Sequence, residues 1–443
     1  MEPLSSTGGP TASLSTEELR RLVGRAVEDE LGACAPRRVL IVPPDRTRPH
    51  SRAGEITALV YRSLVASGCD TRVLPAVGTH HAMTGGEIAR LFDGRVPPER
   101  VLAHRWRDDL VDLGEIDAEE VRRISGGRTG HAIPVAVSRL LLDGWDLVVS
   151  VGQVVPHEVA GMANFTKNLV IGLGGAGTIH GTHWLSALCD METIMGRAQT
   201  PARRVVDAAF DRFLAPRLRV LWILTVVEDT GDRIVLRGLF TGRGRSTESG
   251  GAAFAAAANL SAACNITTVP EALDRVVCRM DEGEYTSTWV ANKAIYRTRM
   301  ALATGGELVV LAPGVSRFAE DPLADRLVRA HGYHGTGSTL GAVDADPDLA
   351  GNLCAAAHLI HGSAEGRFRI VYCTAPDRGG LSRDEIESVG YEWRDLDGEI
   401  GGLGVDAATP TGPRADRAGR PFHFVANPAL GLWTGAWSET GRR

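Results

Sequence analysis

The sequence is poor in cysteine, in long apolar runs and in any excess of one charge. Its seven cysteines are odd in number and scattered, with no CxxC pair, which argues against a disulfide framework and a zinc-thiolate site. No apolar run is long enough to span a bilayer, so we expect no membrane partner. The net charge of -6 is mildly acidic, which argues against a nucleic-acid partner.

The N-terminal stretch MEPLSSTGGPTAS also lacks the basic and apolar regions of a secretory signal. Together with the scattered cysteines, this predicts a cytoplasmic protein. The composition, 44% hydrophobic and 23% charged, is typical of a soluble globular protein, and 443 residues suffice for two or three domains.

Strand-like and helix-like segments alternate from Arg38 onward. RVLIVPP, TRVLPAVGTH and WDLVVSVGQ are strand-like, while AGEITALVYRSLVASG and TGGEIARLF have helical apolar spacing. RVLWILTVVED and RIVLRGLFTG are expected to form a hairpin around Thr230-Gly231-Asp232. Ser15 and Glu18 form a capping box that predicts the start of the first helix. This alternation predicts an α/β fold with mainly parallel sheets.

The pattern changes after Gly250, where an Ala-rich helix leads into a link at Asn265–Glu271. We therefore expect two α/β domains with the active site in the cleft between them. Expected parts are a flexible N-terminus (1–14), an N-terminal cofactor-binding and catalytic domain (15–264), a C-terminal domain (268–396) and a tail (405–443) that returns to the first domain.

Two polar clusters follow expected strands, where open α/β sheets bind ligands. In Asp45-Arg46-Thr47-Arg48-Pro49, Arg48 can hold a carboxylate or phosphate in bidentate fashion, although an ion-paired loop would have the same composition. In Gly78-Thr79-His80-His81, a histidine at a strand end suits general base catalysis. The alternative there is a partly exposed loop histidine.

The richest stretch, VVPHEVAGMANFTKNLVIGLGGAGTIHGTHW, follows a third expected strand. It carries His157, Lys167, His180 and His183, any of which has a structural alternative, such as a core histidine or a solvated surface lysine. Glycines between them can let a backbone approach a phosphate, but they lack dinucleotide or Walker spacing. These glycines are Gly172, Gly174, Gly175 and Gly177. Polar groups at three consecutive strand ends favour a site for an ion and a phosphorylated ligand.

In this order, DRTRP, GTH, PHEVAGMANFTK and a second GTH before Trp184 resemble the nickel-dependent lactate racemase family. That family includes relatives that act on other 2-hydroxy acids and on sugar acids. The resemblance covers Arg38 to Leu188 and is weaker in the second domain. It implies a racemase or epimerase that inverts C2 of a small 2-hydroxy acid.

The resemblance also implies a cofactor, the nickel pincer nucleotide (pyridinium-3,5-bisthiocarboxylic acid mononucleotide nickel). Lys167 matches the lysine that bonds covalently to this cofactor, and His183 matches the histidine that ligates nickel. His80 and His157 match the two acid/base histidines. Arg48 is then expected to bind the substrate carboxylate, and Asp45 and the four glycines to bind the cofactor.

Such residue types suit the chemistry. Removing the C2 hydrogen as hydride, while a base takes the hydroxyl proton, gives a transient 2-keto acid, and hydride return to the other face inverts the centre. Two bases and a cationic clamp on the carboxylate are then needed. The cofactor would supply the hydride chemistry and the protein the orientation.

The sequence also departs from the family pattern. Asn164-Phe165-Thr166 stands where the lactate racemases usually have a Gly-Gly pair before the lysine. In the second domain, Tyr296-Arg297-Thr298-Arg299-Met300 places arginine in a glutamine position and methionine in a lysine position. Arg297 or Arg299 is therefore expected to bind a substrate longer and more polar than lactate.

Two alternatives remain open. A zinc hydrolase on the same histidines would give Lys167 no role and would need a further carboxylate or histidine ligand. A non-catalytic sugar-acid sensor would have no need of two acid/base histidines. Neither the particular 2-hydroxy acid nor the oligomeric state follows from the sequence.

Overall fold

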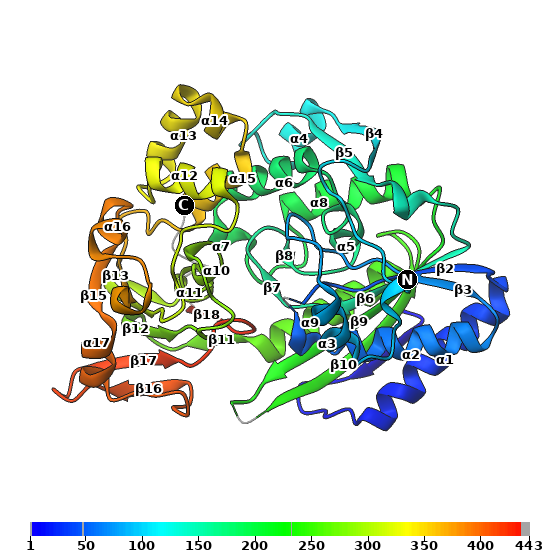
Figure 1. Cartoon of the computed structure of the whole chain (residues 1–443), viewed down its shortest axis with the longest axis horizontal. Coiled ribbons are helices and arrows are strands. Elements are labelled where there is room, and N and C mark those ends of the chain that lie inside the picture. Colours follow the sequence, from blue (N-terminus) through cyan, green and yellow to red (C-terminus); the bar gives the residue numbers. More distant parts are fainter. Residues whose placement is uncertain (1, 47, 232, 436–443) are drawn as a thin grey trace. The chain divides into compact units, whose positions relative to one another are not determined.

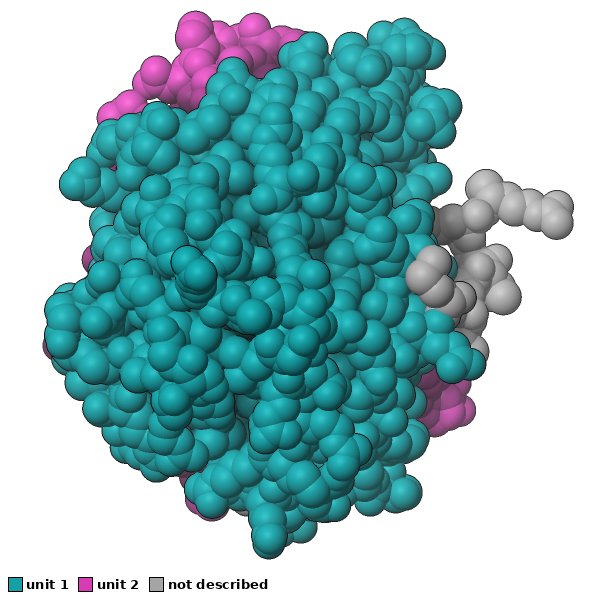
Figure 2. All heavy atoms as spheres, turned by 90° about the vertical axis from the view of Figure 1, so that its right-hand side faces the viewer, with its two compact units in different colours: residues 1–189, 193–265 teal, residues 190–192, 266–443 magenta. Residues whose placement is uncertain are grey.

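The computed structural model describes residues 2–46, 48–231 and 233–435, and the chain forms two compact units (Figures 1 and 2). The first unit contains residues 1–189 and 193–265, and the second contains residues 190–192 and 266–443. Each unit has its own six-stranded sheet. The predicted α/β fold with mainly parallel sheets in two regions is thereby confirmed.

The sheet of the first unit has the order β1-β10-β9-β6-β2-β3. Its strands are β1 (Ser5–Gly8), β2 (Arg38–Val42), β3 (Asp70–Val73), β6 (Leu147–Gln153), β9 (Val220–Asp229) and β10 (Ile234–Arg243). β9, β6, β2 and β3 pair in parallel. β9 and β10 form the expected antiparallel hairpin, and β1 adds to its edge. Asp232, at the tip of that hairpin, lies outside the described residues.

Helices cover this sheet and also lie at the ends of its strands. They are α1 (Thr16–Cys34), α2 (Ala53–Ala66), α3 (Gly85–Phe92), α4 (Ala118–Ile124), α5 (Thr166–Val170), α6 (Ala176–Leu188), α8 (Pro201–Ala209) and α9 (Ser249–Asn265), and α7 (Met191–Ile194) has residues in both units. α1 begins as predicted, because Ser15 and Glu18 form a capping box. α9 is the expected Ala-rich helix.

Two small ladders complete the first unit. They are β4 (Leu110–Ile116) with β5 (Ile133–Ser138), and β7 (Pro156–His157) with β8 (Gly161–Met162), both antiparallel. The core between sheet and helices is continuous and includes Phe165, Trp222 and Phe254. The ring of Phe165 stacks on that of Phe254 with centroids 5.1 Å apart. The loop before Lys167 is therefore anchored in the main core.

The sheet of the second unit has the order β15-β14-β13-β12-β17-β16 and is parallel except for its β16 edge. Its strands are β12 (Leu273–Arg279), β13 (Leu302–Leu311), β14 (Arg369–Thr374), β15 (Glu392–Asp395), β16 (Gly412–Ala415) and β17 (Pro421–Val425), and a separate parallel pair consists of β11 (Ile266–Val269) and β18 (Leu432–Gly435). The tail 405–443 was expected to return to the first domain. Its described part instead pairs with the second unit, β17 with β12 and β18 with β11, because the edges of β12 and β11 accept these strands in parallel.

Short helices surround the second sheet. They are α10 (Thr288–Ala291), α11 (Lys293–Thr298), α12 (Pro322–His331), α13 (Thr336–Ala345), α14 (Pro347–Ala350), α15 (Leu353–His361), α16 (Arg383–Ser388) and α17 (Leu396–Leu403). The core of this unit includes Val309, Val371 and Phe424. Within the described ranges of both units, we find no helix with the length and apolarity that a membrane crossing would need.

Candidate active site

The carboxyl ends of three neighbouring strands carry the polar motifs. β6, β2 and β3 are adjacent and parallel, so their ends meet at one edge of the sheet. Asp45 and Arg48 follow β2, His80 follows β3, and His157 follows β6. Thr47 of the DRTRP motif lies outside the described residues. The structure therefore brings together motifs that are far apart in the sequence.

Asp45 and His80 form a close pair across two of these strand ends. The Nδ1 atom of His80 lies 2.6 Å from the Oδ2 atom of Asp45, a buried carboxylate, whereas the imidazole is half exposed. An ionised carboxylate only accepts hydrogen bonds, so Nδ1 carries the proton and donates it. The lone pair of His80 is then on Nε2, where it can take a proton from a ligand. Asp45 thus orients the imidazole of His80, and the cofactor contact expected for Asp45 stays a prediction.

His157 is buried and has the other tautomer. Its Nδ1 atom accepts a hydrogen bond from the Val159 N–H at 3.0 Å, with the Ala160 N–H at 3.5 Å. The neutral ring must therefore carry its proton on Nε2. Burial lowers the pKa of His157 well below its ordinary value, so the ring is neutral near pH 7. At Nε2, then, His80 accepts and His157 donates.

Lys167 is an amine in an environment that disfavours its charge. Burial, followed by the nearby Arg48 guanidinium, lowers the pKa of Lys167 to about 8. A substantial fraction of the side chain is thus a neutral, nucleophilic amine near pH 8. Lys167 and Lys293 are the two lysines of the whole chain. Lys167 is partly buried, so a fully solvated surface lysine does not describe it.

α5, which carries Lys167, is attached directly to the strand ends. The Nδ2 atom of Asn168 donates to the Val42 carbonyl of β2 and to the Ser150 hydroxyl of β6, both at 3.0 Å. These bonds fix the helix against two of the three strands. The position of Lys167 is therefore set by the sheet.

His183 lies on α6 with one nitrogen committed to the backbone. Its Nδ1–H donates to the Ile179 carbonyl at 2.7 Å, which leaves the Nε2 lone pair for a ligand. Such a backbone bond is the usual way that a metal-binding histidine is oriented. Burial lowers the pKa of His183 to about 4, so protons compete weakly for that lone pair. Neighbouring His180 contributes a further lowering and is assigned no ligand role.

Charged groups around these residues lie close enough to shift one another's pKa values. Arg48 and Lys167 both lower the pKa of His157, while Glu158 raises the pKa values of His157, Lys167 and His183. The Glu158 carboxylate lies 3.8 Å from Nδ1 of His157. The sequence interpretation missed Glu158, for which adjacency to His157 is the available signal. Two cations near neutral histidines favour an anionic ligand.

The glycines between Lys167 and His183 are closely packed, and cofactor binding by them stays a prediction. An added Cβ would lie 2.4 Å from the Asn168 carbonyl oxygen at Gly172 and 2.3 Å from the Val170 oxygen at Gly174. At Gly175 and Gly177, it would meet the side chains of Leu110 and Pro134. The N–H groups of Gly172, Gly174 and Gly175 are bonded to backbone carbonyls. These glycines therefore allow close packing of α5 and α6, because a side chain at any of the four positions would meet a neighbouring residue.

The arginines expected to bind substrate, Arg297 and Arg299, are buried within the second unit. Arg299 donates to Glu192 at 3.1 Å and to the carbonyls of His361 and Ser363. Nη2 of Arg297 donates to the Ala429 carbonyl at 3.1 Å. These bonds give both guanidinium groups a structural role, and substrate binding by either stays a prediction.

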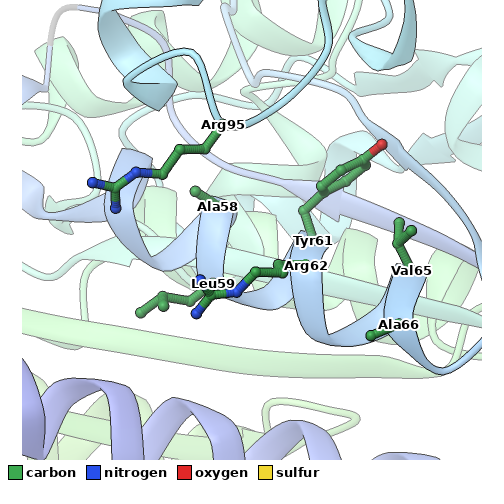
Figure 3. Close-up of a pocket in the computed structure, with 7 residues that line it drawn as sticks. All are labelled: Ala58, Leu59, Tyr61, Arg62, Val65, Ala66 and Arg95. Atoms are coloured by element: carbon green, nitrogen blue, oxygen red, sulfur yellow. The ribbon is translucent and has the colours of Figure 1, made fainter.

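A hollow of about 340 Å³ lies elsewhere, on α2 (Figure 3). Side chains between Ala58 and Ala66 line it together with Arg95. None of its seven lining residues is a histidine, cysteine or carboxylate, so none is a common metal ligand. Among residues 2–46, 48–231 and 233–435, no group of three or more His, Cys, Asp or Glu side chains is placed to hold a metal ion.

Comparison with solved structures gives two similar chains. A Thermotoga maritima protein matches with a TM-score of 0.81 and 23% identity, over 97% of this chain and 100% of its own. The lactate racemase apoprotein from Thermoanaerobacterium thermosaccharolyticum matches with a TM-score of 0.64 and 15% identity, over 94% of this chain and 92% of its own. Both likenesses concern the fold. No curated protein matches the chain.

A family model gives the more specific result. Residues 15–196 match the lactate racemase N-terminal domain, and this range includes Asp45, Arg48, His80, His157, Lys167 and His183. The motifs that suggested the family thus lie inside the matched range. Through this N-terminal domain, residues 15–196 belong to the lactate racemase family.

Proposed function

We propose that the protein is a racemase or epimerase that inverts C2 of a 2-hydroxy acid with a nickel pincer nucleotide. One observation carries the proposal. His80 and His157 lie at strand ends on either side of β2 and have opposite protonation at Nε2, so one accepts a proton where the other donates. Exchange of a hydroxyl proton on two faces of one carbon requires two such groups.

Arg48 supplies the carboxylate clamp in this scheme. Arg48 is partly buried, and its guanidinium lowers the pKa values of Lys167 and His157. A guanidinium binds a carboxylate through two parallel hydrogen bonds, which fixes the orientation of a 2-hydroxy acid. Binding of the anion would also offset the repulsion between Arg48 and protonated Lys167.

His80 takes the hydroxyl proton in the state seen here. A substrate hydroxyl on its side gives its proton to Nε2, and the resulting imidazolium is stabilised by the Asp45 carboxylate at 2.6 Å. His157 meanwhile donates its Nε2–H to a substrate oxygen on the other side. For His157 to act as the base, its proton must move to Nδ1 and the contact with the Val159 N–H must break.

The residues also fit the cofactor. The Lys167 amine, with its pKa near 8, suits a covalent attachment, and the free Nε2 of His183 suits nickel, which accepts imidazole and sulfur ligands. When bound, the cofactor would accept and return the C2 hydride. The support for the cofactor therefore comes from Lys167 and His183.

The two alternatives are less well supported. A zinc hydrolase needs three protein ligands, a set that the described residues do not form. A non-catalytic sensor would have no use for the carboxylate that orients His80 or for a lysine with a lowered pKa. Neither alternative predicts inversion of a 2-hydroxy acid.

A stereochemical assay tests the proposal. Protein made together with the cofactor-synthesis machinery is incubated with single enantiomers of 2-hydroxy acids, from lactate to aldonates, and the products are separated by chiral chromatography. We expect inversion of at least one acid, with loss of inversion in both His80→Ala and His157→Ala. Inversion near the wild-type rate in either variant would contradict the two-histidine scheme. A loaded enzyme that inverts none of the acids would support the sensor.

A further inference from the structure

The turn immediately before Lys167 is strained. Asn164 and Phe165 are consecutive non-glycine residues with positive φ angles of 66° and 60°. Side chains disfavour this region, so such residues persist only where surrounding contacts hold them. The turn sits at the entrance to α5, whose second residue is Lys167. Something in the fold must hold this conformation in place.

Arg203, on α8, contacts this turn at three points. Its Nη1 atom donates to the Asn164 carbonyl at 3.2 Å and to the Thr166 hydroxyl at 3.0 Å, and its Nη2 atom donates to the Met162 carbonyl. The side chain is fully buried. A planar guanidinium with several fixed donors is suited to bind several acceptors at once.

We propose that Arg203 is a positioning residue whose buried guanidinium braces the turn 162–166 and thereby fixes where the Lys167 amine lies. The inference rests on the proposed function, in which Lys167 is the attachment residue for the cofactor. Arg203 itself touches neither substrate nor cofactor in this account. Its action passes through the backbone of the turn.

Aromatic packing explains how the brace is stabilised. Phe165 is buried, with its ring centroid 4.7 Å from that of Trp222 and stacked on Phe254. The Arg203 guanidinium lies over the ring of Phe254, 4.5 Å from the ring centroid. Phe254 thus supports both the strained residue and the side chain that holds it.

The Asn164 side chain completes the turn. Its Oδ1 atom accepts from the Phe165 N–H at 2.6 Å. A Cβ at Gly152, on β6, would lie 2.0 Å from the Asn164 Nδ2 atom, so only glycine leaves room there. The turn is therefore shaped from the sheet side by Gly152 and from the helix side by Arg203.

Fixing the turn determines the environment of the lysine. Lys167 directly follows the braced residues, so the direction of its side chain depends on their backbone angles. The positive charges of Arg203 and Arg48 lower the pKa of the Lys167 amine, whereas the carboxylates of Glu158 and Asp45 raise it. Loss of the brace would let the amine move toward water and take up a proton more readily.

Amine labelling of the full-length apoprotein tests the proposal. Reductive methylation over a series of pH values, read by peptide mass spectrometry, reports on Lys167, and Lys293 is an internal reference in the same chain. We expect a midpoint near pH 8 for wild-type Lys167. Arg203→Met should raise this midpoint by about one pH unit or more, toward the ordinary lysine value of about 10.4. Arg203→Lys keeps the positive charge but loses the planar group with several donors, so this variant should also raise the midpoint.

Arg204→Met is the matched control. Arg204 is the next residue on α8 and donates to the Ile124 carbonyl, away from the turn, so the Lys167 midpoint should not move. Adding Asn164→Gly to Arg203→Met should bring the midpoint part of the way back, because glycine adopts positive φ without strain.

An unchanged midpoint in Arg203→Lys would overturn the proposal, because a shift in Arg203→Met alone would follow from the lost charge. So would unfolding of both variants while Arg204→Met folds, because Arg203 would then hold the whole domain and not the turn. Failure of Asn164→Gly to restore the midpoint would exclude the turn as the route. A shifted midpoint without any cofactor on Lys167 would leave the brace intact and count against the proposed function alone.

Discussion

The buried carboxylate of Asp45 lies 2.6 Å from Nδ1 of His80 and so determines which nitrogen of that imidazole carries the proton. The two residues come from loops after different strands, β2 and β3. An imidazole held in this way presents its lone pair at Nε2 and is stabilised as an imidazolium after it takes a proton.

Asp45→Asn should therefore reduce the rate of inversion while leaving the fold intact. The amide can donate to Nδ1, which would move the imidazole proton to Nε2 and remove the base. We expect kcat to fall by about 10²–10⁴-fold, the typical contribution of a positioned acid/base group. Steady-state kinetics with a circular dichroism check of folding would measure this. A fall in kcat of less than about threefold would contradict the assigned role of Asp45.

The tautomers of the two other histidines are a second prediction. In apoprotein near pH 7, His157 should carry its proton on Nε2, because Nδ1 accepts the Val159 N–H, and His183 should carry its proton on Nδ1, because Nδ1 donates to Ile179. Nitrogen-15 NMR distinguishes the two forms, and His157→Gln and His183→Gln variants would assign the signals. The same tautomer at both positions would contradict the assignment.

Asp207 gives a third prediction, on the dependence of stability on pH. Burial raises the pKa of Asp207 from 3.8 to about 6, so the folded chain holds this proton where the unfolded chain has lost it. The stabilising effect of that proton is complete below pH 3.8 and is lost as the pH rises to about 6.

Asp207→Asn removes this titration and keeps an acceptor for the Thr166 hydroxyl. The free energy of unfolding of the variant, relative to wild type, should therefore increase by about 1.4 kcal/mol per pH unit across that window and then level off. Urea unfolding of the apoprotein at several pH values would measure it. A constant difference between the two proteins would show that Asp207 has an ordinary pKa.

Arg299 gives a fourth prediction, on the second unit. Arg299 and Arg367 both donate to one oxygen of Glu192, and Arg299 also donates to two carbonyls. Arg299→Gln should lower the free energy of unfolding by about 1.5–3 kcal/mol, since it removes buried hydrogen bonds to a charged group. Exposed Arg326→Gln is a suitable control, because a surface ion pair contributes about 0–1 kcal/mol. Equal stability of the Arg299 variant and wild type would contradict the structural role.

Much of the first unit could be predicted from local sequence. Apolar runs such as RVLIVPP and the alternation with helices identify the parallel strands, and their order makes three polar motifs meet at one edge. Capping residues such as Ser15 mark a helix start. These features depend on residues that are near one another in the chain, and the physical rules for them are local.

Other features depend on contacts that local patterns do not encode. The glycines after Lys167 look like phosphate-binding glycines, but Leu110 and Pro134 from the β4–β5 ladder fill the space beside two of them. Nothing near residue 203 in the sequence indicates that Arg203 reaches the turn before Lys167. The pairing of β17 with β12 is likewise long-range, so the local pattern of the tail does not indicate which unit it joins.

The central claim is that the stretch from His157 to His183 holds one cofactor through Lys167 and His183. Peptide mass spectrometry and metal analysis of protein made with the cofactor-synthesis machinery test it most directly. The account predicts added mass on the peptide that contains Lys167, bound nickel, loss of both mass and activity in Lys167→Ala, and loss of nickel in His183→Ala. Active protein with no added mass on Lys167 and no nickel would contradict the claim.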